Sequence, residues 1–319
     1  MFTTYPKNRD NVFLLTSKDK TFFENEIKGE SYSNSISVTG EIANKKIISE
    51  YLDDRFKIIL NYNNAFGHCL HDFLGTLLYE DKNNKKNNRD CLFIIHASNM
   101  YNNNLNKFMI NLLKNLNINY EIISLKDDEI FSISNFKYWK TGAMIYEGIL
   151  EIDKVLNNFY SKNQATKKVY VSRSAMQGQK NDYQLFHENN KEDFMFFDDI
   201  RVDNENILEQ YFKSLNFEIV YPETFKSFED QLLYFSEAKT LVGLTGAGLW
   251  NGLFMPRGSK IFELTTPLAT HGVEYIHNYY KCLGFAKNHK YIAINNMRIA
   301  NDIIDSIEKD ISLRSYISE

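Results

Sequence analysis

Residues 239–264 read KTLVGLTGAGLWNGLFMPRGSKIFEL, and this stretch indicates the fold class most directly. The apolar run 241–244 ends at a Gly-Ala-Gly turn, after which apolar residues recur at helical spacing through residue 254, where a proline and a glycine follow. A second apolar run, 260–264, comes next and carries one carboxylate, Glu263. The stretch therefore predicts a strand, a tight turn, a short helix and a second strand, which is the βαβ unit of a parallel sheet.

The glycine turn predicts an anion site. Glycines let phosphates approach the backbone, and free N–H groups at the start of a helix attract negative charge. We expect the N–H groups of Gly246, Ala247 and Gly248 to hold an anion, most simply a diphosphate. The alternative is that these glycines only close a tight connection in an α/β sheet.

Composition sets the size and excludes several classes of protein. A chain of 319 residues predicts two domains, which we place at 1–160 and 161–319. The formal charge of −4 gives no field for binding nucleic acid. Three cysteines without C-x-x-C spacing predict neither a disulfide framework nor a zinc cluster, and residues 1–20 resemble neither a signal peptide nor a spanning helix. We expect a cytoplasmic protein.

The first half alternates strands and helices. Short apolar runs at 12–15, 35–38 and 57–60 predict strands in the first 60 residues. A helix at 66–80, a polar loop at 81–90, strands at 91–96 and 120–125, and a helix from Asn103 or Asn104 to 116 follow. A helix at 148–160 closes this half, and 161–168 is the predicted linker. The alternation predicts a Rossmann-like domain with a parallel sheet.

A histidine and a carboxylate share one face of the helix at 66–80. His68 and Asp72 are four residues apart, so their side chains are neighbours in its first turns, with His71 beside them. Either group can accept a hydroxyl proton as a general base, oriented by the other, and we slightly prefer Asp72. The alternative is a capping carboxylate and a hydrogen-bonded structural histidine.

The second half repeats the alternation. Strands are predicted at 169–171 and 217–221, helices at 207–215 and 227–238, and amphipathic helices at 273–283 and 301–317. We expect the last helix to pack back on the first domain. Arg173 lies just past the strand at 169–171, where open α/β sheets bind ligands. An arginine fork suits phosphate there, and a surface arginine at a strand end is the alternative.

Several motifs resemble glycosyltransferase family 61. Gly67-His68-x-x-x-Asp72 matches the family's first motif, Ser172-Arg173 its strand-ending pair and Asn204-Glu205 its helix start, and the block from Gly246 to Leu264 matches its last. The similarity covers about residues 66–285. It implies two Rossmann-like domains facing across a cleft, an arrangement called GT-B. It also implies inverting transfer of a sugar from a nucleotide diphosphate donor, held by the C-terminal domain, to an acceptor hydroxyl.

The sequence departs from this family at three positions. Thr245 stands where the family commonly has histidine, which puts the donor preference in doubt. Gly75 stands where a proline is usual, which makes that helix more pliable. The second arginine, Arg201, lies far downstream of Arg173, so residues 174–200 form an insertion.

The resemblance assigns roles to the candidate residues. His68 and Asp72 are the expected catalytic pair, with His71 and Arg201 as further candidates. No metal is expected, since the chain has no D-x-D triplet to bridge a cation to the diphosphate. The donor is expected to be UDP-linked and the acceptor a glycan or glycoconjugate, with the protein peripheral at a membrane that carries it. The expected donor-binding residues are Arg173, Thr245, Gly246, Ala247, Gly248, Asn251 and Glu263, the last on ribose hydroxyls.

Two other functions stay open. A noncatalytic nucleotide- or glycan-binding module is suggested by Thr245 in place of histidine. An NAD-dependent oxidoreductase fits less well, because Gly246, Gly248 and Gly252 give G-x-G-x-x-x-G instead of G-x-G-x-x-G.

Overall fold

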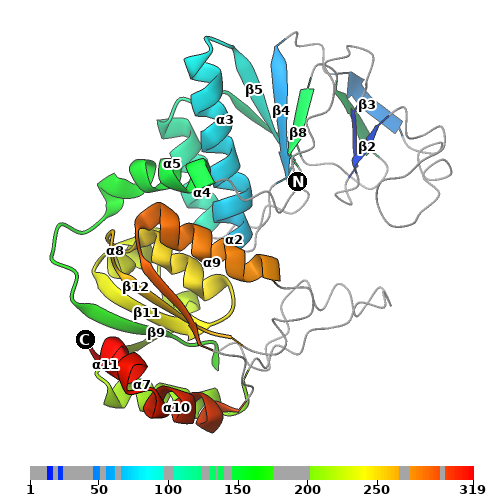
Figure 1. Ribbon diagram of the computed structural model, residues 1–319. Helices are drawn as coiled ribbons and strands as arrows, with labels where there is room; N and C mark the ends of the chain where they lie inside the picture. The colour runs from blue at the N-terminus through cyan, green and yellow to red at the C-terminus, as the bar shows by residue number, and fades with distance from the viewer. Residues whose placement is uncertain are drawn as a thin grey trace. The chain divides into compact units, whose positions relative to one another are not determined.

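The computed structural model consists of two compact units, Met1–Ile152 and Asp153–Glu319 (Figure 1). It describes residues 13–16, 21–23, 46–50, 55–61, 66–96, 104–123, 129–133, 136–139, 146–174, 202–265, 274–294 and 299–319. Each unit contains an all-parallel sheet with helices between its strands. The predicted α/β class is therefore confirmed.

The N-terminal unit has a four-stranded parallel sheet. Its strands are β4 (Phe56–Asn61), β5 (Cys91–His96), β6 (Tyr120–Ile123) and β8 (Phe136–Trp139), in the order β6-β5-β4-β8. The chain runs outward from β4 through β5 and β6 and then returns to the other side of β4. Ligands of open α/β sheets bind at the carboxyl end of such a reversal point, and the residues after β4 occupy that end.

A second, smaller sheet uses strands from the start of the chain. It contains β1 (Phe13–Thr16), β2 (Thr21–Phe23), β3 (Lys46–Glu50) and β7 (Glu129–Ile133), in the order β2-β1-β7-β3. Strand β1 is antiparallel to both neighbours, and β3 is parallel to β7. The apolar runs at 12–15 and 57–60 are confirmed as strands, whereas the run at 35–38 lies outside the described residues.

The helix predicted at 66–80 is longer and less regular than expected. It begins as α2 (Phe66–His68), widens into the π-helical turn η1 (Cys69–Leu74) and continues as α3 (Gly75–Lys86). The predicted polar loop at 81–90 is wrong for its first part, because 81–86 are helical. Polar residues sustain these last turns through an ion pair from Lys85 to Asp81 (2.8 Å) and a bond from the Asn84 amide to the Glu80 carbonyl (2.8 Å). Helix α4 (Asn104–Asn115) also belongs to this unit, and α5 (Tyr146–Leu156) runs across the boundary between the units, with the short η2 (Asn157–Phe159) following it in the C-terminal unit.

Helices α3 and α5 approach backbone to backbone at a pair of glycines. A Cβ added to Gly148 would lie 2.4 Å from the Gly75 carbonyl oxygen, whereas one added to Gly75 would make ordinary contacts, at 3.5 Å with Ile152 Cδ1 and the Leu70 carbonyl oxygen and at 3.6 Å with the Gly148 carbonyl carbon. We expect Gly148→Ala to lower the free energy of unfolding by about 1–3 kcal/mol, because the two helices must separate. Its control, Gly75→Ala, should raise that free energy by up to about 1 kcal/mol through helix propensity. Denaturant titration measures both values, and changes of equal sign and size would contradict this packing argument.

The C-terminal unit is built on a five-stranded parallel sheet. Its strands are β9 (Lys167–Val171), β10 (Glu218–Val220), β11 (Ala238–Leu244), β12 (Lys260–Leu264) and β13 (Lys290–Ile294), in the order β10-β9-β11-β12-β13. The βαβ prediction for residues 239–264 is thus confirmed. The reversal point of this sheet lies between β9 and β11, the strands that lead to Arg173 and to the glycine turn.

Helices cover both faces of this sheet. One face packs against α7 (Glu205–Ser214), α10 (Ala300–Lys309) and α11 (Ile311–Ser318), and the other carries α8 (Phe228–Ser236), η5 (Ala247–Phe254) and α9 (Glu274–Lys287) (Figure 1). Helix α8 begins as predicted, with Ser227 Oγ accepting the Asp230 N–H at 3.0 Å. The single helix predicted at 301–317 is broken at Asp310, which has an extended backbone and caps α11.

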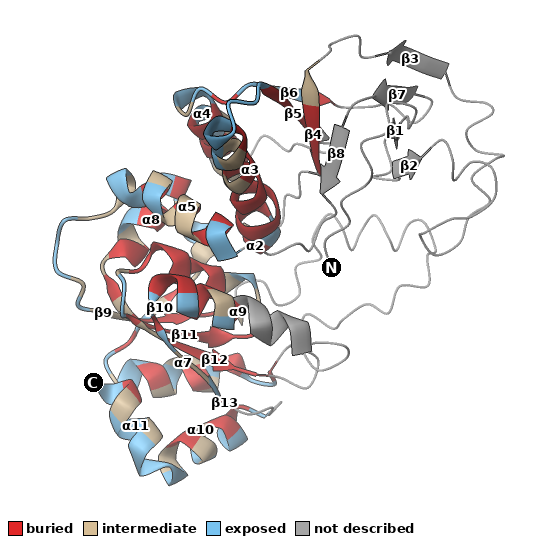
Figure 2. Cartoon of the chain, turned by 45° about the horizontal axis from the view of Figure 1, so that its top comes forward, coloured by how far each residue is buried: buried red, intermediate tan, exposed pale blue. Residues whose placement is uncertain are grey.

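The last helix belongs to the core of the C-terminal unit. Ile303 and Ile307 of α10 and Ile317 of α11 have no more than 1% of their surface exposed and lie in one cluster with Tyr170 and Phe262 of the sheet. Figure 2 shows buried positions along α10 in red. These buried residues cover the sheet of their own unit, and the expected packing of this helix on the first domain stays a prediction.

The helix after the glycine turn is a 3-10 helix, pressed onto the sheet through two glycines. A Cβ on Gly248 would lie 2.7 Å from Val171 Cγ1 of β9, and one on Gly252 would lie 2.5 Å from Ile261 Cδ1 of β12. Larger residues at these positions would lift η5 from the strands. The glycines therefore set the height of η5 above the sheet and with it the position of the turn.

Candidate functional site

The first constellation lies where the chain leaves β4. His68 Nδ1 is 2.6 Å from Asp72 Oδ2, and His71 Nδ1 is 2.5 Å from Asp72 Oδ1. The π-helical turn, in which the Gly75 N–H bonds the Leu70 carbonyl five residues back, gives these three side chains their common position. Single π turns of this kind are frequent at functional sites. The predicted pairing of His68 with Asp72 is present, and His71 joins it.

The three side chains differ in exposure and charge. Asp72 and His71 expose 2% and 3% of their side chains, whereas His68 exposes 48%. Burial raises the pKa of Asp72, but the hydrogen bond from His68 and then the contact with His71 outweigh it and bring the pKa down to about 2. Burial lowers the pKa of His71, against the opposing effect of Asp72. At neutral pH the cluster therefore holds an ionised carboxylate beneath an accessible imidazole.

The same residues have ligand types suited to a metal ion. One ligand atom from each of His68, His71 and Asp72 can be chosen so that all lie within 4.8 Å of one another. In this structure each histidine Nδ1 instead lies against an oxygen of the carboxylate. The carboxylate lies between two imidazoles, hydrogen-bonded to His68 through Oδ2 and in close contact with His71 through Oδ1.

The second constellation joins the ends of β9 and β11. Gly246 has φ of 155°, in the region that favours glycine, and a Cβ there would lie 3.0 Å from Arg173 Nη1. The guanidinium therefore lies directly beside the glycine turn, as expected from the sheet order. Arg173 Nε is buried and has no hydrogen-bond partner among the described residues. A buried donor without an acceptor is costly, and an anion bound at the turn would supply one.

The backbone of the turn offers two N–H groups. The N–H of Thr245 donates to the Leu264 carbonyl (3.1 Å), and that of Gly246 donates to the Tyr280 hydroxyl (3.2 Å). The N–H groups of Ala247 and Gly248, the first two of η5, have no acceptor in the part of the chain that the structure describes. Of the three predicted N–H donors, those of Ala247 and Gly248 remain available to a ligand, because the Gly246 N–H is bonded to the Tyr280 hydroxyl.

Three of the residues predicted to bind the sugar donor lie beneath the turn. Thr245, Asn251 and Glu263 have 0% of their surface exposed. Thr245 Oγ1 donates to Glu263 Oε1 (2.6 Å), and the Tyr291 hydroxyl donates to Glu263 Oε2. Both side chains are buried in this structure and bonded within the protein, and the expected contacts of Glu263 with ribose and of Thr245 with phosphate stay predictions.

Asn251 has a structural partner on each end of its amide. Its Nδ2 donates to the Gly248 carbonyl (2.8 Å), and its Oδ1 accepts from Gln231 Nε2 (2.6 Å). Asn251 thereby ties the turn to α8. With Thr245 and Glu263 it supports the glycine turn from below, and the expected contact of Asn251 with the donor stays a prediction.

Tyr280 and Tyr291 are not among the site residues predicted from the sequence. Tyr280 donates its hydroxyl hydrogen to the Gly246 carbonyl (2.7 Å) and accepts the Gly246 N–H. Tyr280 lies 34 residues from Gly246 in the sequence. Tyr291 lies 28 residues from Glu263. No local motif connects such residues: Tyr291 reaches Glu263 because β13 lies beside β12, and Tyr280 reaches Gly246 from helix α9, which packs on η5. Arg201, a further predicted candidate, lies outside the described residues.

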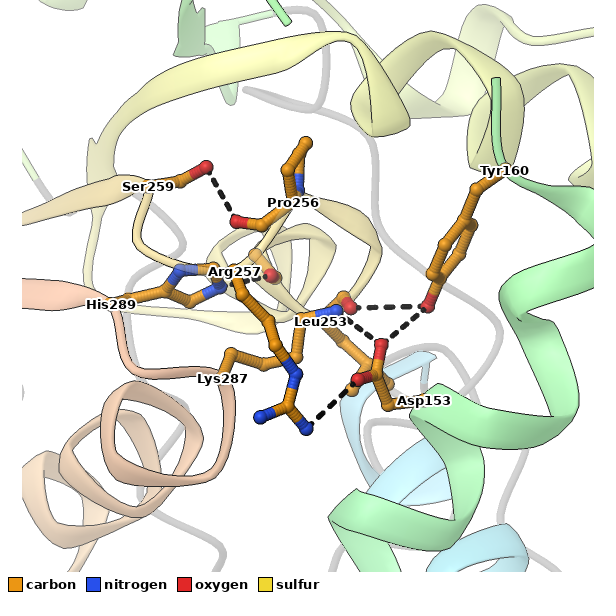
Figure 3. A network of polar contacts seen from close by, with 9 residues as sticks. Asp153, Tyr160, Leu253, Pro256, Arg257, Ser259, Lys287 and His289 are labelled. Atoms are coloured by element: carbon orange, nitrogen blue, oxygen red, sulfur yellow. Dashed lines mark hydrogen bonds and ion pairs between the residues drawn. The ribbon is translucent and has the colours of Figure 1, made fainter. Parts of the chain in front are cut away.

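A buried polar network lies at the other end of η5. The Lys287 ammonium contacts Asp153 Oδ1, Arg257 Nη2 lies 3.4 Å from Asp153 Oδ2, and the Tyr160 hydroxyl donates to Asp153 and the Leu253 carbonyl (Figure 3). His289 Nε2 lies 2.9 Å from the Gly252 carbonyl oxygen. The network anchors the end of η5 to Asp153, Tyr160 and α9 within the C-terminal unit.

His289 should make the stability of the protein depend on pH. Burial lowers its pKa from the usual 6.5 to about 4. Between these values the unfolded chain binds a proton that the folded one does not, so stability is fully present above pH 6.5 and falls as pH approaches 4. We expect His289→Gln, which keeps an amide donor and does not titrate, to lose less stability over this window, by on the order of 3 kcal/mol. Denaturant unfolding of both proteins at several pH values measures the difference, and parallel curves would contradict it.

The protein is of the α/β class and has an arginine beside a glycine turn at one sheet reversal and a histidine–carboxylate cluster after β4, and these side-chain types suit group transfer. The model of the family described as Glycosyltransferase 61 matches residues 66–262, more than half of the chain. The chain belongs to glycosyltransferase family 61, which confirms the resemblance drawn from its motifs. Membership implies glycosyltransferase activity, with a sugar donor and an acceptor. No curated protein matches the chain.

A helix that crosses a membrane must be long and predominantly apolar. None of the helices in the described ranges combines the length and the apolar character that crossing a membrane requires.

Proposed function

We propose that this protein is an inverting glycosyltransferase that moves a sugar from a nucleotide diphosphate donor to a hydroxyl of a glycan acceptor. We further propose the GT-B arrangement, with an acceptor-side domain at 1–160, a donor-binding domain at 161–319 and a cleft between them. The observation that carries the proposal is the Arg173 guanidinium, with its buried unpartnered Nε, beside the turn that presents the N–H groups of Ala247 and Gly248. These donors suit the two phosphates of a nucleotide sugar.

The donor site is proposed to act mainly on the leaving group. Negative charge on the diphosphate grows as the glycosidic bond breaks, so a fixed cation and fixed N–H dipoles stabilise the transition state more than the ground state. The residues below the turn contribute by holding those dipoles in place. We propose that the donor is UDP-linked and that transfer proceeds without a protein-bound metal.

On the acceptor side, we propose His68 as the general base and Asp72 as the group that orients it. Both oxygens of Asp72 are engaged by imidazoles, and a carboxylate with a pKa of about 2 is a weak base. His68 is the accessible member, and with Nδ1 donating to Asp72 its Nε2 is left for the acceptor hydroxyl. This geometry reverses our preference from sequence, which was Asp72.

One experiment separates this function from the two alternatives. The intact protein is incubated with a panel of nucleotide sugars, with and without glycan acceptors, and released nucleoside diphosphate is measured in the presence and absence of EDTA. Transfer or slow hydrolysis by the native protein, but not by His68→Ala, supports the transferase. Binding without turnover for the whole panel would favour a noncatalytic module, and selective stabilisation by NADH an oxidoreductase.

The stereochemistry and the place of action need their own measurements. Proton NMR of the first-formed product reports whether the anomeric configuration inverts. We propose that the enzyme acts in the cytoplasm, peripheral at a membrane that carries its acceptor. Fractionation of cells producing the protein tests that placement.

A further inference from the structure

The loop that carries Arg173 is held by two carboxylates of one helix. Glu205 and Glu209 lie one turn apart on α7. Glu205 Oε1 accepts the Arg173 N–H at 2.9 Å and the Tyr170 hydroxyl at 3.1 Å. Glu209 Oε1 accepts the hydroxyls of Ser172 (2.6 Å) and Ser174 (2.5 Å), the residues on either side of Arg173.

The rest of Glu209 is fixed as well. Its second oxygen, Oε2, accepts the Tyr221 hydroxyl at 3.1 Å, just after β10. The carboxylate therefore connects α7 to the carboxyl ends of two neighbouring strands, β9 and β10. One side chain defines where the loop leaves the sheet.

The charge of these residues opposes the proposed ligand. A carboxylate close to an anion site weakens anion binding through repulsion. Glu205, with 1% of its surface exposed, and the half-buried Glu209 would each reduce the affinity for a diphosphate if charge were their only effect. Their hydrogen bonds to residues 172–174 point to a geometric contribution.

We propose that Glu209 is a positioning residue for Arg173, and that Glu205 assists it by fixing the Arg173 backbone. The carboxylate oxygen that bridges Ser172 and Ser174 sets the direction in which the guanidinium leaves the sheet and meets the glycine turn. This inference rests on the proposed binding of a diphosphate by Arg173. It adds a residue that touches no substrate and acts through another side chain.

A double-mutant cycle tests the coupling. The Kd for UDP is measured by calorimetry for the native protein, Glu209→Ala, Arg173→Ala and the double variant. We expect Glu209→Ala to weaken binding about tenfold when Arg173 is present, because a misplaced clamp loses its contacts. In the Arg173→Ala background the same substitution should change Kd less than about twofold, since sites that act through one another are not additive.

Two further variants separate position from charge and from stability. Glu209→Gln keeps an acceptor oxygen without the charge and should retain native affinity or bind UDP more tightly. The matched control is Glu308→Ala, because Glu308 accepts the Tyr211 hydroxyl of the same helix at 2.7 Å without touching residues 172–174. It should lower thermal stability and leave Kd unchanged.

The outcomes distinguish the inference from the proposed function. Native affinity in Arg173→Ala would overturn both the phosphate site and the inference that rests on it. A strong effect of Arg173→Ala with none of Glu209→Ala, or an equal loss from Glu209→Ala in both backgrounds, would overturn the inference alone.

Discussion

Replacing His68 by alanine is expected to lower kcat by about 10²- to 10⁴-fold, the contribution usual for a general base. His68 is the exposed member of the cluster, and its Nδ1 is held by Asp72 at 2.6 Å. Affinity for the nucleotide donor should stay near that of the native protein, because the donor contacts proposed above lie at Arg173 and the glycine turn. Single-turnover rates and UDP binding, measured on the same preparations, separate the two effects.

Asp72→Asn tests the orienting role beside it. A neutral amide cannot accept N–H groups from two imidazoles through two equivalent oxygens, so at least one ring loses its partner. We expect a loss in kcat of the same order as for His68→Ala, with the fold retained. His289→Gln, which changes a histidine in the other unit, serves as the control and should keep the native rate. Native turnover in folded His68→Ala and Asp72→Asn proteins would remove the cluster from catalysis.

Replacing Arg173 by alanine is expected to weaken UDP binding by about 10- to 100-fold, since a hydrogen bond to a charged group contributes about 1.5–3 kcal/mol. The guanidinium is the cation beside the turn, and its buried Nε has no acceptor among the residues described. Arg173→Lys should recover only part of the loss, because an ammonium lacks the planar fork. Calorimetric titration of UDP and the KM for the donor both report the effect.

Arg257→Ala is the matched control for this charge. Arg257 has a side chain that is 59% exposed and pairs with Asp153 at 3.4 Å, away from residues 172–174. It removes one positive charge from the same unit, so a general electrostatic effect would appear in both variants. Equal affinities in Arg173→Ala and the native protein would reject the proposed phosphate contact.

Periodicity was enough to predict most of the architecture. The apolar runs and the Gly-Ala-Gly turn placed β11, η5 and β12 within a few residues, and the alternation of strands and helices predicted both parallel sheets. The errors lie in polar segments, because the same polar residues occur both in loops and in exposed helical turns. The segment 81–90 is rich in Asn and Lys, which suit a loop, yet ion pairs continue α3 to Lys86.

The sequence predicts the positions of the candidate site residues better than it predicts the roles of their side chains. A residue that follows a strand is known from sequence to lie at the carboxyl edge of the sheet. Whether its side chain points outward or downward depends on the backbone of the turn. Arg173 points toward the turn, whereas Thr245 points down to Glu263. The hydroxyl of Tyr280, contributed from thirty-four residues away, could not be predicted because no spacing rule links it to Gly246.

The π-helical turn at Cys69–Leu74 holds one residue more than a regular turn of the same helix would. Deleting a single residue there would restore a uniform helix and rotate His68 by about 100° relative to Asp72, while leaving α3 free to keep its packing. Under the proposed function, the loss of one codon there would separate the proposed base from its carboxylate while leaving residues 172–174 and 246–248 in place, so turnover would be lost before donor binding.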